Sequence, residues 1–347
     1  MLDDRNVIKQ RDRANALDMA AAACEQVGFA THIEHHEHDG RVIQNIIIAG
    51  MGGAGLAADI VHQLIAGELT IPLETVKGYS LPRYASSSSL VILTSTSGNT
   101  EETLSCLNQA TACGAQLAIV AAGGKLVEFA RTADIAHATF PQMSQARMGM
   151  LYNLRAILTV LVAYRLVSRV VLDDMASSRE WLEAEVQTWM KDMPLEHNYA
   201  KQLALQAAGK TALFMGSDVT ACMAYKWKVS WNENAKNLAF HAQLPESNHN
   251  EFIGWTSHPV DKPFIIFDIR SELEHPRIAK RYELTDRLLS GMRPKAHEVW
   301  LKGDGLVRQV LWGCILSDFV SVYLGIINNA DPTQVGLTET LKLELTQ

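Results

Sequence analysis

Along the first half of the chain, short apolar runs alternate with segments whose apolar residues recur at helical spacing. The runs lie at Asn45–Ala49, Leu73–Val76, Val91–Leu93 and Gln116–Ala121, and a further strand is expected around Asp134–Phe140. Such runs, ended by glycine or polar residues, are typical of strands buried on both faces. Because strands and helices alternate, the pattern predicts right-handed βαβ units and a parallel sheet covered on both faces.

The same pattern returns in the second half of the chain. Strands are expected at Thr211–Ser217, Pro263–Ile269 and His297–Lys302, and helices near Val219–Asn234, Pro276–Leu289 and Leu306–Ile327. Between the halves, Met148–Val170 predicts a long apolar helix, and polar residues separate it from a helix at Trp181–Met193. The chain therefore contains a degenerate internal repeat.

These patterns predict an α/β protein with two tandem doubly wound, flavodoxin-like parallel sheets. We expect a helical segment at 1–40, with a helix at Asn15–Gly28, and a first domain at 41–170. A helical bridge at 171–205 would lead to a second domain at 206–347 that ends in a C-terminal helix.

The stretch Val91–Thr103 offers the clearest candidate binding site. Its apolar strand opens into Thr94, Ser95, Thr96, Ser97, Gly98, Asn99 and Thr100, and a helix is expected to begin at Glu101. Hydroxyl groups and free backbone N–H groups at a helix N-terminus favour an anion. Since the loop lacks the lysine of a P-loop, we predict a phosphate cradle for a small phosphomonoester.

A glycine-rich loop, GMGGAG at 50–55, follows the strand Asn45–Ala49 and precedes an apolar helix. Its spacing fits the dinucleotide fingerprint, and Glu74 lies near the position of a ribose-binding carboxylate. However, a dinucleotide domain does not need the second loop at Ser95–Thr100. Two such loops at consecutive strand ends suggest one small phosphorylated ligand held between them.

Charge and composition narrow the functional class. The 347 residues carry a formal net charge of −7, which disfavours nucleic acid as a partner. No apolar run approaches the roughly 18 residues needed to cross a bilayer, and the polar N-terminus shows no secretory signal. The five cysteines lack C-x-x-C spacing, so we predict reduced thiols in a cytoplasmic protein.

A His-rich segment, His32–His38, could bind a metal on composition alone. The alternative is a polar strand or turn that leads to Gly40, and we find no complementary ligand set later in the chain. We therefore predict no metal site.

A second concentration of polar residues lies at Lys226–Trp255, where Trp227 and Trp231 alternate with amide, carboxylate and imidazole groups. This mixture suits a walled pocket better than a solvated face. Glu233 could be a surface carboxylate and His249 a loop imidazole. Together with a phosphate cradle, they suggest instead proton transfer on a sugar phosphate.

Four motifs in this order, GMGGAG, TSTSGNTEET, NENAK and NHN, resemble the bifunctional phosphoglucose/phosphomannose isomerases, a family of sugar isomerase (SIS) domain proteins. The resemblance runs from Asn45 to Lys342, and its most specific part is the spacing from Glu233 to His249. It implies two SIS domains and a homodimer, with active sites at the subunit interface to which the neighbouring chain contributes His249.

The resemblance also implies roles for single residues. The phosphate-binding positions are Gly52, Gly53, Ser95, Ser97 and Thr100. Arg147 would stabilise the enediolate by its fixed charge. Glu233 would move the proton between C1 and C2, His249 would open the sugar ring, and Lys342 would assist ring opening. No cofactor is implied.

Two departures from the family pattern are visible. Ala54 stands where the family usually has serine, which removes one hydroxyl donor from the phosphate site. The polar residue that holds the ring during C2 epimer discrimination is either Thr333 or Gln334.

The sequence thus predicts a metal-independent aldose–ketose isomerase that interconverts glucose 6-phosphate, and mannose 6-phosphate, with fructose 6-phosphate. One alternative is a non-catalytic regulator that binds sugar phosphates. Another is a nicotinamide-dependent dehydrogenase, which GMGGAG and Glu74 alone support.

Overall fold

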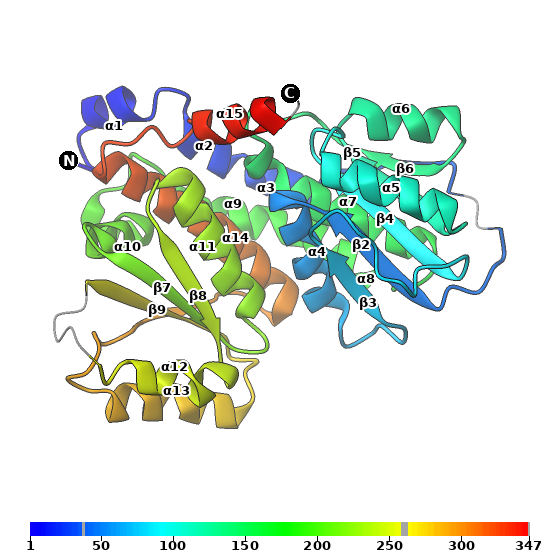
Figure 1. The fold of residues 1–347 in the computed structure, drawn as a ribbon. Coiled ribbons are helices and arrows are strands. Elements are labelled where there is room, and N and C mark those ends of the chain that lie inside the picture. Colours follow the sequence, from blue (N-terminus) through cyan, green and yellow to red (C-terminus); the bar gives the residue numbers. More distant parts are fainter. Residues whose placement is uncertain (37–38, 258–262, 346–347) are drawn as a thin grey trace. The chain divides into compact units, whose positions relative to one another are not determined.

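The computed structural model describes residues 1–36, 39–257 and 263–345 and divides the chain into two compact units (Figure 1). Unit A, as we call it, is Ala22–Glu180. Unit B combines Met1–Ala21 with Trp181–Gln347, so the first helices of the chain pack with its second half.

Unit A is built on a six-stranded sheet in the order β1-β6-β5-β4-β2-β3. The strands are β1 (Ile33–Glu34), β2 (Asn45–Gly50), β3 (Leu73–Val76), β4 (Ser89–Ser95), β5 (Gln116–Ala121) and β6 (Ala136–Thr139). All neighbours pair in parallel except β1, which lies antiparallel to β6. The short β1 falls in the His-rich segment, where a polar strand or turn was the alternative to a metal site.

Helices cover both faces of this sheet. They are α3 (Ala23–Val27), α4 (Gly52–Ile65), α5 (Glu101–Ala112), α6 (Gly124–Thr132), η1 (Ala146–Gly149), α7 (Met150–Ala163) and α8 (Val170–Ser177), and α9 (Arg179–Gln187) runs across the boundary between the units. On one face, α5 and α6 bury Cys106, Leu107 and Leu126 against the strands. Helices α4 and α7 pack against each other and against the strands. This arrangement confirms the predicted doubly wound class.

Unit B contains a four-stranded parallel sheet in the order β10-β9-β7-β8. Its strands are β7 (Thr211–Gly216), β8 (Ala239–Gln243), β9 (Phe264–Arg270) and β10 (His297–Trp300). Its helices are α1 (Arg5–Arg11), α2 (Ala16–Ala21), η2 (Leu195–His197), α10 (Tyr199–Ala207), α11 (Ala221–Asn234), η3 (Glu246–His249), α12 (Glu251–Gly254), α13 (Pro276–Leu288), α14 (Gly305–Ile327) and α15 (Gly336–Leu345).

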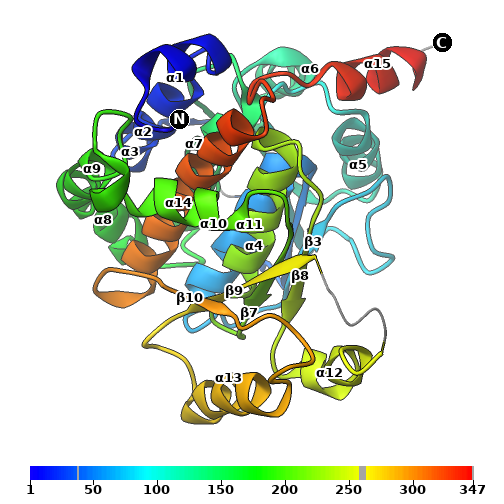
Figure 2. The same cartoon turned by 90° about the vertical axis from the view of Figure 1, so that its left-hand side faces the viewer.

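Helix α14 is the central helix of unit B, and α10 and α11 pack against it (Figure 2). It is apolar along 23 residues, so it is long enough to cross a membrane. Residues Ala146–Ala163 also pass this test of length and composition. The prediction that no apolar run approaches this length was therefore wrong. Because 89% of the apolar window in α14 and 67% of that in Ala146–Ala163 are buried inside the protein, both are core helices.

The helix predicted at Met148–Val170 is shorter than expected. It ends at Ala163, and Arg165 then adopts a left-handed φ of +58°, which breaks the helical path. Part of the polar connection expected at Leu172–Glu180 is instead helical, because α8 spans Val170–Ser177. Apolar residues continue through this break, so their spacing alone did not mark the helix end.

Candidate active site

The two loops singled out in the sequence leave neighbouring strands of unit A. Gly50 at the end of β2 pairs with Thr94 near the end of β4. Because these strands are parallel, the GMGGAG and TSTSGNT loops begin at the same edge of the sheet. This is the carboxyl edge, where doubly wound sheets bind their ligands.

Hydroxyl groups shape the loop between β4 and α5. The Ser95 and Thr100 hydroxyls lie 2.8 Å apart, and Ser95 Oγ also accepts from the Gly98 N–H at 3.1 Å. Ser97 is exposed, and its hydroxyl accepts from the Asn99 N–H. Within the described residues, the Thr100 side chain makes no capping hydrogen bond to α5. The first turn of α5 therefore offers its backbone N–H groups to an external anion.

Glycine is required at the bend of this loop. Gly98 has a φ of +67°, and a Cβ atom built there would lie 1.8 Å from the carbonyl oxygen of Gly123. Asn99 ties the same bend to α6, because its Oδ1 accepts from the Lys125 N–H at 3.1 Å. The loop is thus held in place by the end of the next strand, β5.

The GMGGAG loop lies close to the backbone of Arg147 in unit A. Gly52 has a φ of +51°, and a Cβ atom on Gly53 would lie 3.7 Å from the Cα atom of Arg147 in η1. Arg147 is half-buried, and its guanidinium donates to Gln145 Oε1 at 3.0 Å. The structure thus places all the predicted phosphate residues and Arg147 in unit A. Ala54, which replaces the usual serine, is buried.

Asn153 supports this site and was missed by the sequence reasoning. It is fully buried in α7, accepts from Thr94 Oγ1 at 3.1 Å and donates to Thr96 Oγ1 at 2.9 Å. A buried amide must be hydrogen-bonded, so an asparagine inside an apolar helix was a usable signal.

Glu233 and His249 lie in unit B. Glu233 is half-buried in the last turn of α11, and His249 is exposed at the end of η3. The two asparagines of NHN hold η3: Asn248 donates to Thr285 Oγ1 at 3.1 Å, and Asn250 Oδ1 accepts from the Glu251 N–H. His249 is thus presented between two anchored residues.

Topology separates Glu233 from His249 within one chain. Helix α11 connects the parallel strands β7 and β8, so its C-terminal end lies where β8 begins, whereas η3 follows the end of β8 (Figure 1). The five residues of β8 span roughly 16 Å. The structure therefore does not bring these two side chains together in one unit B.

The remaining predicted residues follow α14. Lys342 belongs to α15, but its side chain lies outside the described part of the structure. Thr333 is buried, and its hydroxyl donates to Asp331 Oδ1 at 2.7 Å, whereas Gln334 is exposed.

In the second repeat, the loops that follow β7 and β9 have polar groups that are hydrogen-bonded within the chain. Between β7 and α11, the buried Ser217 and Thr220 hydroxyls bond to each other and to the backbone of Val219 and Ile269. After β9, the Glu274 carboxylate accepts from the Ser271 N–H at 3.2 Å and from Arg270 Nε at 3.0 Å. These hydroxyl, carboxylate and backbone groups are thus hydrogen-bonded to one another within the chain.

The tryptophans of Lys226–Trp255 do not wall a pocket. Trp227 and Trp231 are fully buried and pack with Phe214 and Phe267 in the core of unit B. The predicted pocket wall was wrong here because these positions face the sheet from α11. Helical spacing in the apolar residues, rather than their mixture with polar ones, marks this core.

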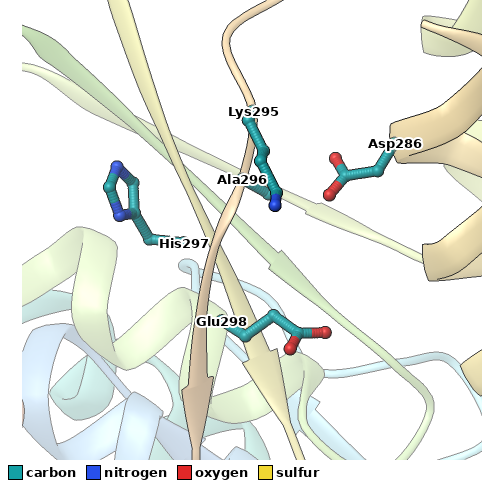
Figure 3. Close-up of a pocket in the computed structure, with 5 residues that line it drawn as sticks. All are labelled: Asp286, Lys295, Ala296, His297 and Glu298. Carbon is teal, nitrogen blue, oxygen red and sulfur yellow. The ribbon is translucent and has the colours of Figure 1, made fainter. Parts of the chain in front are cut away.

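A cleft in unit B contains none of the predicted residues. It is lined by Asp286, Lys295, Ala296, His297 and Glu298 (Figure 3). Asp286 and Glu298 lie near the buried Asp268, and burial raises the pKa of Asp268 to about 7. Arg293 pairs with Asp286, to which it donates at 2.7 Å.

The described residues contain no group of three or more His, Cys, Asp or Glu side chains that could hold a metal ion. In the His-rich segment, Glu37 and His38 lie outside the described residues.

A curated relative decides the family. The bifunctional phosphoglucose/phosphomannose isomerase of Caldicellulosiruptor bescii is 31% identical over 88% of this chain and 90% of its own length. This chain belongs to the bifunctional phosphoglucose/phosphomannose isomerase family. The predicted family is confirmed. The model of the bacterial phospho-glucose isomerase C-terminal SIS domain also matches residues 196–345.

One further relative and one solved structure are also similar to this chain. The D-glucosamine-6-phosphate 4-epimerase of Sulfolobus acidocaldarius is 29% identical over 61% of this chain and 64% of its own length. A glucose-6-phosphate isomerase like protein from Thermus thermophilus superposes with a TM-score of 0.62 over 99% of this chain and 98% of that chain. At 18% identity, this similarity supports the fold alone.

Proposed function

We propose that this family member is a metal-independent isomerase that interconverts glucose 6-phosphate, and mannose 6-phosphate, with fructose 6-phosphate. The observation that supports the proposal is the close approach of Gly53, in the GMGGAG loop, to the backbone of the half-buried Arg147: a Cβ atom at Gly53 would lie 3.7 Å from the Cα atom of Arg147. Such an arrangement suits a substrate with a phosphate at one end and developing negative charge at the other.

In the proposed reaction, Gly52, Gly53, Ser95, Ser97 and Thr100 hold the phosphate. His249, assisted by Lys342, moves the proton that opens the sugar ring. The ionised Glu233 then removes the proton from C2 of the aldose, and Arg147 stabilises the negative charge of the enediolate. Glu233 returns this proton to C1 while the hydroxyl proton of O2 passes to O1, which yields the ketose. Rotation about C2–C3 of the intermediate lets the same carboxylate serve both epimers.

The proposed site is shared between subunits of a homodimer. Its support is the separation of Glu233 and His249 by the length of β8 within one chain. A neighbouring chain would then supply His249 to the site that contains Glu233.

A coupled assay with fructose 6-phosphate, in the presence of chelator and without nucleotide, tests the proposal. Glu233→Gln keeps the shape of the side chain but removes the base, so we expect activity to fall by about 10² to 10⁴-fold. Glu283→Gln changes an exposed carboxylate that pairs with Lys280 at the surface; it is the matched control and should keep wild-type activity.

Three outcomes would contradict the proposal. Substrate binding without turnover would indicate the regulator, and dependence on added nicotinamide cofactor would indicate the dehydrogenase. Full activity in Glu233→Gln would show that another residue moves the proton.

A further inference from the structure

We propose that Asn234 and Asn328 are positioning residues that clamp the C-terminal end of α11 and thereby set the position of the Glu233 carboxylate. The inference rests on the proposed function, because it assigns Glu233 the role of the base. It concerns contacts within unit B alone.

A ladder of buried polar side chains joins α11 to α14. Lys226, Ser230 and Asn234 repeat at every fourth residue and so share one face of α11. Lys226 Nζ and Ser230 Oγ reach Asp318 Oδ1 at 2.6 and 2.8 Å. Asn234 Nδ2 donates to Ser321 Oγ at 3.0 Å. The ladder therefore runs from the middle of α11 to the residue beside Glu233.

Because the ladder is buried, it favours a single position of α11 relative to α14. Asn234 and Ser321 are both fully buried, so a lost hydrogen bond leaves polar groups without water. A rotation of α11, or a slide by one turn along α14, would break every step of the ladder. Because Glu233 directly precedes Asn234, its backbone is held by the same contacts.

The backbone beyond α11 is held as well. Asn328 Nδ2 donates to the Ala235 carbonyl at 3.1 Å. Lys236 adopts a φ of +51°, and its ammonium group donates to the carbonyls of Glu233 and, at 3.2 Å, of Pro332. The end of α11 is thus tied to the turn that follows α14.

Close helix packing limits the remaining freedom. A Cβ atom on Gly325 of α14 would lie 2.6 Å from the carbonyl oxygen of Asn234. The two backbones therefore approach each other directly beside Glu233. A base placed on such a rigid support keeps its distance to the reacting carbons, and a misplacement of about 1 Å can cost about a hundredfold in rate.

Steady-state kinetics of Asn234→Ala, Ser321→Ala and the double variant test the inference, with rates expressed per folded molecule. We expect kcat to fall by about ten- to a hundredfold and KM to change by less than about threefold, because the phosphate-binding loops are untouched. The double variant should be no slower than Asn234→Ala, since both changes remove the same contact.

Asn328→Ala is the second variant, chosen because Asn328 is exposed and its loss leaves the core intact. It should lower kcat in the same way. Asn198→Ala is the matched control: Asn198 is also a buried asparagine of unit B, but it caps α10. This control should lower the unfolding temperature and keep kcat.

The outcomes separate this inference from the proposed function. An inactive wild type overturns both. An active wild type whose kcat is unchanged in folded Asn234→Ala and Asn328→Ala overturns the clamp alone. A fall of kcat in Asn198→Ala as large as in Asn234→Ala would also overturn it, because general loosening of the unit would then explain the effect.

Discussion

Asp268 is a carboxylic acid buried inside unit B. It lies on β9, is 2% exposed, and its Oδ1 has no hydrogen-bond partner within the described residues. Burial is the main cause that raises its pKa to about 7, and Arg293 and Arg270 oppose this only in part. The folded protein therefore holds this proton at pH values where the unfolded chain has lost it.

This proton should make stability depend on pH. Between about pH 4, near the unfolded pKa, and about pH 7, the folded state binds more protons than the unfolded state. The free energy of unfolding should therefore fall as pH rises through this window, by on the order of 3 kcal/mol. Urea unfolding of unit B, followed by its tryptophan fluorescence, measures this loss at pH 5 and pH 8.

In Asp268→Asn the dependence on pH should be much weaker, because the titrating group is gone. Asp218→Asn changes an exposed aspartate of the same unit and should leave the wild-type slope. A wild-type stability that rises from pH 5 to pH 8 would contradict the predicted direction.

At the residue scale, local motifs were predictable and their supports were not. Gly98 and the serines near it predict a polar bend after a buried strand. Asn153 and Asp268, by contrast, matter because of partners or burial that only the folded chain creates. Nothing in their neighbouring residues shows which strand or helix will cover them.

At the scale of elements, two loops of related composition differ in how far their hydroxyl groups are exposed. In the β4–α5 loop, Ser97 is exposed, whereas the Ser217 and Thr220 hydroxyls of the β7–α11 loop are buried and bonded internally. Hydroxyls in a loop therefore indicate an anion site only where their hydrogen bonds remain open to a ligand.

This difference leads to a prediction for Ser97→Ala. Loss of one hydrogen bond to a charged phosphate should raise KM for fructose 6-phosphate by about tenfold or more, since such a bond contributes about 1.5 to 3 kcal/mol. The change in kcat should be small because the phosphate does not react.

Initial rates at varied substrate concentration measure this shift. Ser177→Ala in α8 is the control: Ser177 is exposed, lies in the same unit and bonds only a neighbouring carbonyl. An unchanged KM in Ser97→Ala would remove Ser97 from the phosphate site.

Strands and helices with strong periodicity were predicted closely, and weak ones were not. Strands β3 and β5 lie at the predicted residues. Strand β8 was missed, because this edge strand exposes Phe240, His241 and Gln243 and so lacks an apolar run. Edge strands bury less of their surface, and their sequences carry a weaker signal.

At the scale of the whole molecule, the chain is a repeat with unequal halves. The predicted division at 41–170, 171–205 and 206–347 stays a prediction. Unit A contains the proposed phosphate loops and Arg147, whereas unit B contains Glu233 and His249. An apolar pattern could predict the repeated architecture, but not the first two helices of the chain within unit B, because that placement depends on contacts far apart in sequence.

The proposed sharing of His249 between subunits can be tested by complementation. Glu233→Gln and His249→Ala should each be inactive alone. After subunit exchange, their mixture should regain about one quarter of wild-type activity, because about half of the dimers are mixed and each of these holds one intact site. A coupled assay before and after exchange measures the recovery.

A mixture of His249→Ala with Arg147→Ala tests which groups share a chain. Absence of recovery in the first mixture, with mixed dimers verified by mass spectrometry, would show that Glu233 and His249 of one chain act together. The proposed dimeric site would then be wrong.

The Glu274 carboxylate accepts hydrogen bonds from Arg270 and from the Ser271 N–H, so these donors at the end of β9 are occupied by a negative group of the chain itself. Its negative charge belongs to the chain, so it is present at a constant effective concentration and cannot diffuse away. To bind there, a free phosphate ester would have to displace the Glu274 carboxylate and take its place as the hydrogen-bond acceptor of Arg270. Under the proposed function, we therefore expect the phosphate of the substrate to bind at the first sheet and not at the end of β9.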